Sequence, residues 1–278
     1  MSHISFPTTS DELLELQQQP EARIMAGGTD LLVALRHGLQ HTGTIICLER
    51  IEELSRIEEQ ADGSFSIGAA VPFSAIVRSP LLKEHYPLLT QAASTVGGPA
   101  IRNMATIGGN IVTASPAADS LPALYLLDAR LELRSAIGNR QVPIADFITG
   151  PRRTMLQPGE VITRIILPPP QPWTIQRFEK VGRRKSLAIA VASLAAAVRL
   201  AYDGTVAEAR FAWGSVGPTV MRCNQVEKSL INKPLTVETL STVAEQVRQA
   251  VCPIDDIRAT ADYRRAVAAN LLLRLLDQ

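Results

Sequence analysis

The sequence predicts an α+β protein of two domains, from three observations. Its 278 residues are about the length of two globular domains. Near the N-terminus the pattern reads strand, glycine turn, helix, strand, which is typical of a βαβ unit. Behind a run of prolines, two long strand-like segments meet at Asp203-Gly204, and three helical segments follow. That order predicts an antiparallel sheet covered by helices.

The first element is a helix that begins behind Thr9. Residues 9–12 have the Thr-x-x-Glu pattern of a capping box, and Pro20 ends the helix because proline disfavours the helical conformation of its predecessor. "ARIMAGG" predicts a short strand entering a glycine turn, and apolar residues at helical spacing follow from Asp30 to Leu39. The segment "GTIICL" then reads as a buried strand.

The middle of the chain begins with a hairpin. Asp62-Gly63 stands between two alternating segments, a strong hairpin signal, and residues 72–98 read as a run of short helices. A helix is expected within 115–129, then strands at 130–135 and 159–167. The proline-rich stretch 168–172 is the best linker, so the domain boundary is expected near Trp173.

Charge and cysteine usage exclude several classes of protein. Lys and Arg number 28 against 27 Asp and Glu, which gives a formal charge of +1 and no field that would attract nucleic acid. Cys47, Cys223 and Cys252 form no metal-binding motif and suit a reducing cytoplasm. No signal peptide is visible, and the longest apolar run is too short to cross a membrane. A soluble cytoplasmic protein is expected, with no metal site.

Two Gly-Gly pairs are the strongest chemical signals. Gly27-Gly28 follows a strand and precedes a helix, where unpaired amide groups can bind an anion, with Thr29 or Asp30 as the N-cap. For one such pair alone, a purely steric turn is the better explanation. The second pair, Gly108-Gly109, stands in a segment rich in hydroxyl, amide and carboxylate groups. Two such loops from separate segments could therefore close on one extended ligand.

These residues resemble a known family, the FAD-binding medium subunits of molybdenum hydroxylases such as xanthine dehydrogenase and carbon monoxide dehydrogenase. The motifs that match are "MAGGTDLL" and "GGPAIRNMATIGGNIVTASPAADS", and the likeness extends through "GEVITRIILPPP" and "RFEKVGRRKS" over nearly the whole chain. The resemblance implies a vanillyl-alcohol-oxidase (PCMH)-type FAD-binding domain over 1–172, made of α+β subdomains at about 1–55 and 56–172. A small domain over 173–278, with a three-stranded antiparallel sheet and helices, would follow. This fold is not a Rossmann fold, and the chain has no GxGxxG motif.

The resemblance also implies the cofactor, a non-covalently bound FAD, and its ligands. The amides of residues 26–29 would wrap the diphosphate, and Asp119 would hold a polar group of the nucleotide. Val96 stands where some relatives carry an aromatic residue over the flavin. Lys180 is a candidate cation near the flavin, or else a surface lysine. The cofactor-binding residues implied are Ile24, Met25, Ala26, Gly27, Gly28, Thr29, Asp30, Leu31, Val96, Thr106, Ile107, Gly108, Gly109, Asn110, Ser115, Asp119, Ile162 and Lys180.

As to function, the resemblance implies an electron-transfer subunit of a xanthine dehydrogenase-like complex. Partner subunits would carry [2Fe-2S] clusters and the molybdopterin cofactor, and FAD on this chain would pass electrons to NAD⁺ or another acceptor. No catalytic side chain is expected, because the redox chemistry belongs to the flavin. Two alternatives stay open: a scaffolding or nucleotide-binding subunit that has lost FAD, and a free-standing NADH-dependent flavin reductase.

Overall fold

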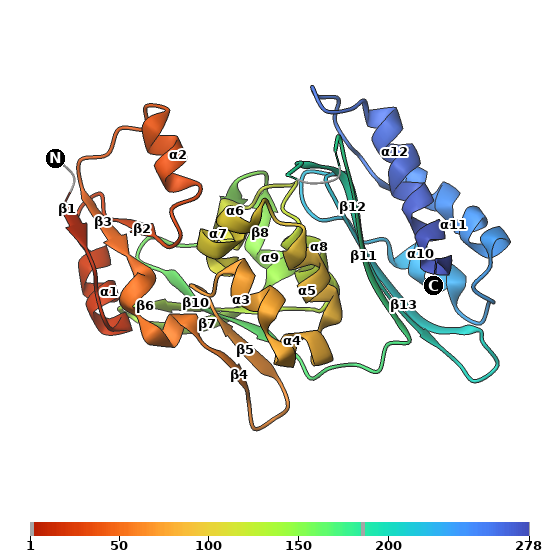
Figure 1. Cartoon of the computed structure of the whole chain (residues 1–278), viewed down its shortest axis with the longest axis horizontal. Coiled ribbons are helices and arrows are strands. Elements are labelled where there is room, and N and C mark those ends of the chain that lie inside the picture. The colour runs from red at the N-terminus through yellow and green to blue at the C-terminus, as the bar shows by residue number, and fades with distance from the viewer. Residues whose placement is uncertain (1–2, 185–186, 278) are drawn as a thin grey trace.

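The computed structural model describes residues 3–184 and 187–277, and it shows an α+β fold in three successive parts (Figure 1). A small N-terminal sheet lies at one end, a larger sheet with several short helices occupies the middle, and a second sheet backed by helices forms the other end. Among the described residues, no helix has the length and apolar character needed to span a membrane.

The N-terminal part is the predicted βαβ unit with one added strand. Its sheet has the order β1-β3-β2 with parallel pairing. Thr9 caps the first helix as expected, since its side-chain oxygen accepts a hydrogen bond from the amide of Glu12 at 3.2 Å. The elements are β1 (His3–Ser5), α1 (Ser10–Gln17), β2 (Arg23–Met25), α2 (Leu31–Arg36) and β3 (Thr44–Cys47), followed by 3₁₀ turns at Leu48–Arg50 and Glu52–Ser55.

The middle part is built on a five-stranded antiparallel sheet of order β4-β5-β10-β6-β7. Its first hairpin turns at Asp62-Gly63 as predicted, with Gly63 at a φ of +78°. The strands are β4 (Ile57–Glu59), β5 (Phe65–Gly68), β6 (Arg130–Ser135), β7 (Gly138–Pro143) and β10 (Val161–Leu167), with a small pair β8 (Ile148–Gly150) and β9 (Arg153–Thr154). The helices are α3 (Phe73–Arg78), α4 (Pro80–His85), α5 (Pro87–Ser94), α6 (Pro99–Met104), α7 (Ile107–Thr113), α8 (Ser120–Leu126) and α9 (Ile144–Phe147).

The second glycine pair does not form a loop, which corrects the sequence-based expectation. Gly108 and Gly109 lie in the first turn of α7, because Thr106 caps that helix by accepting from the amide of Gly109 at 3.2 Å. The helix expected within 115–129 begins only at Ser120, since Ser115 and the residues after it form a turn. Glycine and proline obscured both boundaries in the sequence.

The C-terminal sheet has the order β11-β12-β13 and is antiparallel, as predicted. Its central strand is buried on both faces: Ala195 and Ala197 join the core shared with the middle helices, and Ala196 and Val198 join the core under the C-terminal helices. This double burial explains the unbroken apolar run in the sequence. The elements are β11 (Ile175–Gly182), β12 (Ala190–Leu200), β13 (Val206–Gly214), α10 (Asn224–Leu230), α11 (Val237–Ala250), α12 (Ala261–Asn270) and a 3₁₀ helix (Leu271–Leu276).

The Gln91 side chain joins the C-terminal sheet to the middle helices. Its Nε2 donates to the carbonyl of Gln176 at 3.3 Å, and its Oε1 accepts from the amide of Phe178 at 2.9 Å. A second link runs from the amide of Ser215 to the carbonyl of Pro116, 2.9 Å apart. The C-terminal sheet is thereby fixed beside α5 and the turn before α8.

Candidate cofactor-binding site

A cavity of about 660 Å³ lies where the N-terminal and middle parts meet, and residues of α2, α6 and α7 all contribute to its wall. Its size is typical of a small-molecule or cofactor site. Most of the residues implied by the family resemblance line it. They are Ile24, Met25, Ala26, Gly27, Gly28, Thr29, Asp30, Leu31, Val96, Thr106, Gly108, Gly109, Asn110 and Ile162.

The first glycine loop presents unused hydrogen-bond donors to this cavity. Gly28 has a φ of +70°, and a Cβ on Gly27 would lie 1.6 Å from the carbonyl oxygen of Met104, so both positions require glycine. Within the described chain, the amides of Gly27, Gly28 and Thr29 donate to no protein group. Such free donors suit a diphosphate or another anionic ligand.

The second glycine pair offers no comparable amides. Those of Ile107 and Gly108 donate to the carbonyls of Val71 and Ala69 at 3.1 and 2.9 Å, and that of Gly109 is held by the Thr106 cap. This segment instead contributes side chains. Asn110 lines the cavity, and its Oδ1 accepts from the Ser120 hydroxyl at 2.7 Å, which leaves the Asn110 NH₂ group for a ligand.

Four of the implied residues stand apart from the cavity wall: Ile107, Ser115, Asp119 and Lys180. Ile107 is fully buried in the core. Lys180 forms an ion pair with Asp119, with 2.5 Å between Nζ and Oδ2, and it also donates to the carbonyl of Thr95 at 3.0 Å. Both partners are largely buried, so Lys180 is not a surface lysine.

This ion pair is connected to the cavity wall through sequence neighbours. Thr95 precedes the lining residue Val96, and Asp119 precedes Ser120, which holds Asn110. Burial raises the pKa of Asp119 to about 6, and the nearby Lys180 charge opposes that rise. The other carboxylate oxygen of Asp119, Oδ1, is buried without a hydrogen-bond partner among the described residues. The pair thus adjoins residues of the cavity wall without lining the cavity itself.

The cavity wall also contains residues that sequence reasoning missed. The Gln17 side chain lines it and donates to the carbonyl of Glu160 at 3.0 Å, while its Oε1 is buried without a partner among the described residues. Arg140 donates two hydrogen bonds to the Glu160 carboxylate, at 2.6 and 2.8 Å, and lowers its pKa. An unpartnered oxygen in a cavity wall suits a ligand that can donate a hydrogen bond. The remaining residues missed include Arg23, Ala34, Leu39, Leu48, Ile101, Val112 and Leu156.

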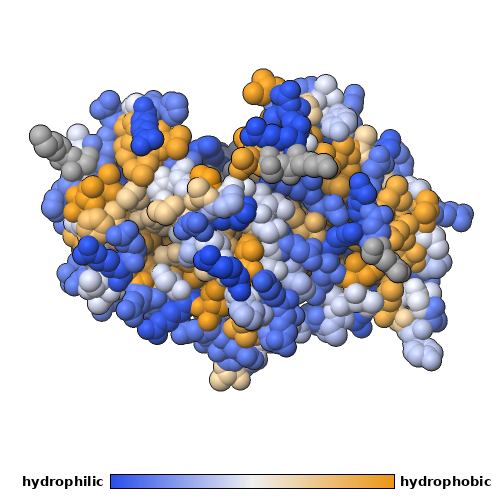
Figure 2. All heavy atoms as spheres, in the orientation of Figure 1, coloured by the Kyte–Doolittle hydropathy of each residue, from blue (hydrophilic) through white to orange (hydrophobic). Residues whose placement is uncertain are grey.

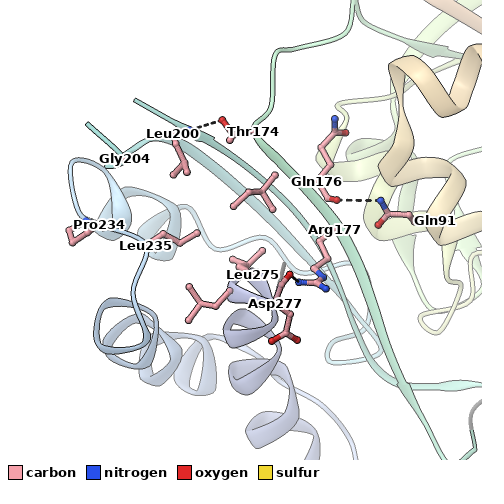
Figure 3. A pocket seen from close by; sticks show the side chains of 12 residues that line it. Gln91, Thr174, Gln176, Arg177, Leu200, Gly204, Pro234, Leu235, Leu275 and Asp277 are labelled. Atoms are coloured by element: carbon pink, nitrogen blue, oxygen red, sulfur yellow. Dashed lines mark hydrogen bonds between the residues drawn. The ribbon is translucent and has the colours of Figure 1, made fainter. Parts of the chain in front are cut away.

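A second hollow, of about 820 Å³, opens beside the C-terminal sheet and contains none of the implied residues (Figure 3). Several of its polar groups have partners. The Thr174 hydroxyl accepts from the amide of Leu200 at 3.0 Å, and Arg177 donates to the carbonyl of Asp277 at 2.5 Å. Among the described residues no group of three or more potential metal ligands occurs. The cavity at the glycine loop is therefore the candidate site.

Comparison with known sequences finds two family models that together cover nearly the whole chain. Residues 1–170 match the family model for the FAD-binding domain in molybdopterin dehydrogenase, and residues 177–278 match the C-terminal domain of the carbon monoxide dehydrogenase flavoprotein. A putative xanthine dehydrogenase FAD-binding subunit of Escherichia coli K12 is 34% identical, covering 98% of this chain and 93% of the relative. The nicotinate dehydrogenase FAD-subunit of Eubacterium barkeri is 33% identical, covering 98% and 95%.

Solved structures agree with the sequence comparisons. Carbon monoxide dehydrogenase from Hydrogenophaga pseudoflava matches with a TM-score of 0.92 and 30% identity, covering 99% of this chain and 96% of that one. Quinoline 2-oxidoreductase from Pseudomonas putida 86 matches with a TM-score of 0.93 and 28% identity, covering 99% and 95%. The fold is thus the PCMH-type FAD-binding fold with a C-terminal three-stranded sheet. The chain belongs to the family of FAD-binding medium subunits of molybdenum hydroxylases of the xanthine dehydrogenase and carbon monoxide dehydrogenase type.

Proposed function

We propose that this chain binds FAD without a covalent bond in the 660 Å³ cavity and is the electron-exit subunit of a molybdenum hydroxylase complex. The observation that carries the proposal is the row of unused amides at Gly27, Gly28 and Thr29, facing a cavity in a chain of an FAD-binding family. Three backbone donors at one turn match the negative charge of a diphosphate.

The implied cofactor-binding residues fall into two groups, those that contact the cofactor and those that position the contacting residues. Residues 24–31, Val96, Thr106, Gly108–Asn110 and Ile162 form the contacting wall. Ile107, Ser115, Asp119 and Lys180 position that wall rather than touch the ligand. Bound FAD supplies the redox chemistry. The protein side chains bind it and orient it, and none is needed as a general base.

The partners that we propose are a small subunit with two [2Fe-2S] clusters and a large subunit with the molybdopterin cofactor. The relative from Hydrogenophaga pseudoflava is a carbon monoxide dehydrogenase medium chain, and one from Paenarthrobacter nicotinovorans is a nicotine 6-hydroxylase medium subunit. The three cysteines of this chain are fewer than the four thiolates that one cluster requires. Electrons would therefore arrive from a partner's clusters and leave to NAD⁺ or another acceptor.

Two finer points belong to the same proposal. We place the complex in the cytoplasm, which is supported by three cysteines that form no disulfide. We also divide the chain at 172/173, with a further division near residue 55. The prolines between β10 and β11 support the first boundary, and the change from the parallel to the antiparallel sheet supports the second.

The test is the visible absorption spectrum of the purified chain, followed by acid release and chromatography of any flavin. About one FAD per chain is expected. A colourless protein that takes up no added FAD would overturn the proposal and favour a scaffolding subunit. Rapid reduction of a dye by NADH without partner subunits would favour a free-standing flavin reductase instead.

A further inference from the structure

Helix α2, residues Leu31–Arg36, has an unusual composition for its position. Residues 31–35 are all apolar, yet no residue of α2 is buried, and Leu32 and Val33 are 45% and 50% exposed. Figure 2 shows the resulting hydrophobic surface over this helix. Helix α3 has the same length and buries both Phe73 and Ile76 completely. A helix that is apolar all round is normally enclosed on more than one side.

The protein itself gives α2 little support. No helix or strand of the described chain packs extensively against it. Among the described residues, one side-chain hydrogen bond links the start of α2 to another element, from the Thr113 hydroxyl to the Asp30 carboxylate at 3.3 Å. A helix of six residues is far below the length at which isolated helices are stable in water, so packing must hold it.

One side of α2 faces the cavity. Leu31 and Ala34 line it, and so does Leu39 just beyond the helix end. All three are half-buried, so a ligand that fills the cavity would complete their burial. The helix also begins directly behind the free amides of the first glycine loop. A ligand held by that loop therefore lies against these apolar side chains.

We propose that Leu31, Ala34 and Leu39 form an apolar wall of the FAD site, and that bound FAD is the packing partner that holds α2 in place. The inference rests on the proposed function. Cofactor binding and the folding of α2 are then coupled, because FAD binds only the conformation in which α2 is formed. Loss of FAD releases α2, while the C-terminal sheet and its helices are unaffected.

Hydrogen exchange measured by mass spectrometry tests this on the full chain, with FAD bound and after FAD removal. Peptides covering residues 29–39 are expected to exchange at least about 10-fold faster without FAD. Peptides from α11 (Val237–Ala250) are expected to stay unchanged. Equal exchange of 29–39 in both forms would overturn the inference. If the chain binds no FAD at all, the proposed function fails instead, so the two failures are distinguishable.

Two variants distinguish the effect of a cavity-facing side chain from the effect of an exposed side chain on α2. Leu39→Ala removes a cavity-facing side chain, and we expect FAD affinity, measured by flavin fluorescence, to fall about 10-fold with faster exchange of 29–39. Val33→Ala removes an exposed side chain that does not line the cavity, and affinity should stay within about twofold. Equal affinities of the two variants would contradict the assignment of the wall.

Discussion

Gly27-Gly28 and Gly108-Gly109 are the same dipeptide beside the same cavity, but they do different things. At the first pair the amides are unused and the loop faces the ligand space. At the second pair the amides are consumed by Ala69 and by the Thr106 cap, and the pair starts a helix. The difference shows that a glycine pair near a cofactor cavity does not by itself mean backbone contacts with the cofactor.

Steric surroundings explain why both pairs nevertheless contain glycine. Gly27 packs directly against the carbonyl of Met104, the last residue of α6. A Cβ on Gly108 would lie 2.7 Å from the Cβ and from the carbonyl oxygen of Ala69. In the first case a side chain would displace the loop that carries the ligand donors. In the second it would separate α7 from the sheet. Substitutions at the two positions should therefore have different consequences.

The largest effect is expected from Gly27→Ala. The new Cβ would overlap the backbone of Met104 and push the loop away from its position, so the three free amides would no longer converge. FAD content is expected to fall from about one per chain to less than about one tenth, measured by absorption and acid release. Gly150→Ala is the control, since the nearest atom to its Cβ would be Arg153 Cδ at 3.8 Å, an ordinary contact. Unchanged FAD content in Gly27→Ala would contradict the role of the first pair.

Gly108→Ala should mainly affect stability. Its Cβ would be forced against Ala69, and such overpacking costs typically about 1–3 kcal/mol in the free energy of unfolding. Urea unfolding of the FAD-free protein measures this cost in the absence of the ligand. The folded variant should keep more FAD affinity than Gly27→Ala. Normal stability together with lost FAD binding would make the two pairs equivalent and remove the contrast.

The third effect concerns the Lys180–Asp119 ion pair, and it appears only as a pH dependence. Burial raises the pKa of Asp119 from 3.8 to about 6, so between these values the folded chain holds this proton more tightly than the unfolded chain. The contribution of Asp119 to stability therefore decreases as pH rises from about 4 to 6, by roughly 1–3 kcal/mol.

Asp119→Asn removes that titration. Losing the Lys180 contact shifts the whole stability profile, so the readout is the slope between pH 4 and pH 7 from urea unfolding. We expect the stability of the parent, relative to the variant, to fall as pH rises. Parallel profiles for the two proteins would show that the carboxylate does not titrate in this range.

The elements that depend on short-range sequence patterns could be predicted from the sequence. The Thr9 cap, the Asp62-Gly63 turn and the long apolar β12 were all recognisable locally, and the structure confirms them. Helices α6 and α7 were missed because proline and paired glycines are typical of loops. The structure shows that Thr106 caps α7 and that Gly108 allows the helix to lie close to Ala69.

The candidate site was predictable where it consists of one continuous segment. Residues 24–31, which the family resemblance implied, all line the cavity. Gln17 and Glu160 meet across 143 positions, a distance that no sequence pattern bridges. Asp119 and Lys180 were recognised as polar residues near the site, but their pairing with each other depends on how the C-terminal sheet packs. Their position beside the wall is therefore a property of the tertiary structure.

The hydrogen bonds of the Gln91 side chain affect how readily this chain can associate with other copies of itself. An outer strand with unpaired amides and carbonyls can template a strand from another molecule, which is how domain swapping and fibril growth begin. The carboxamide of Gln91 occupies the carbonyl of Gln176 and the amide of Phe178 as a neighbouring strand would. A single side chain from α5 thus blocks that stretch of β11 against self-association, without adding a strand to the sheet.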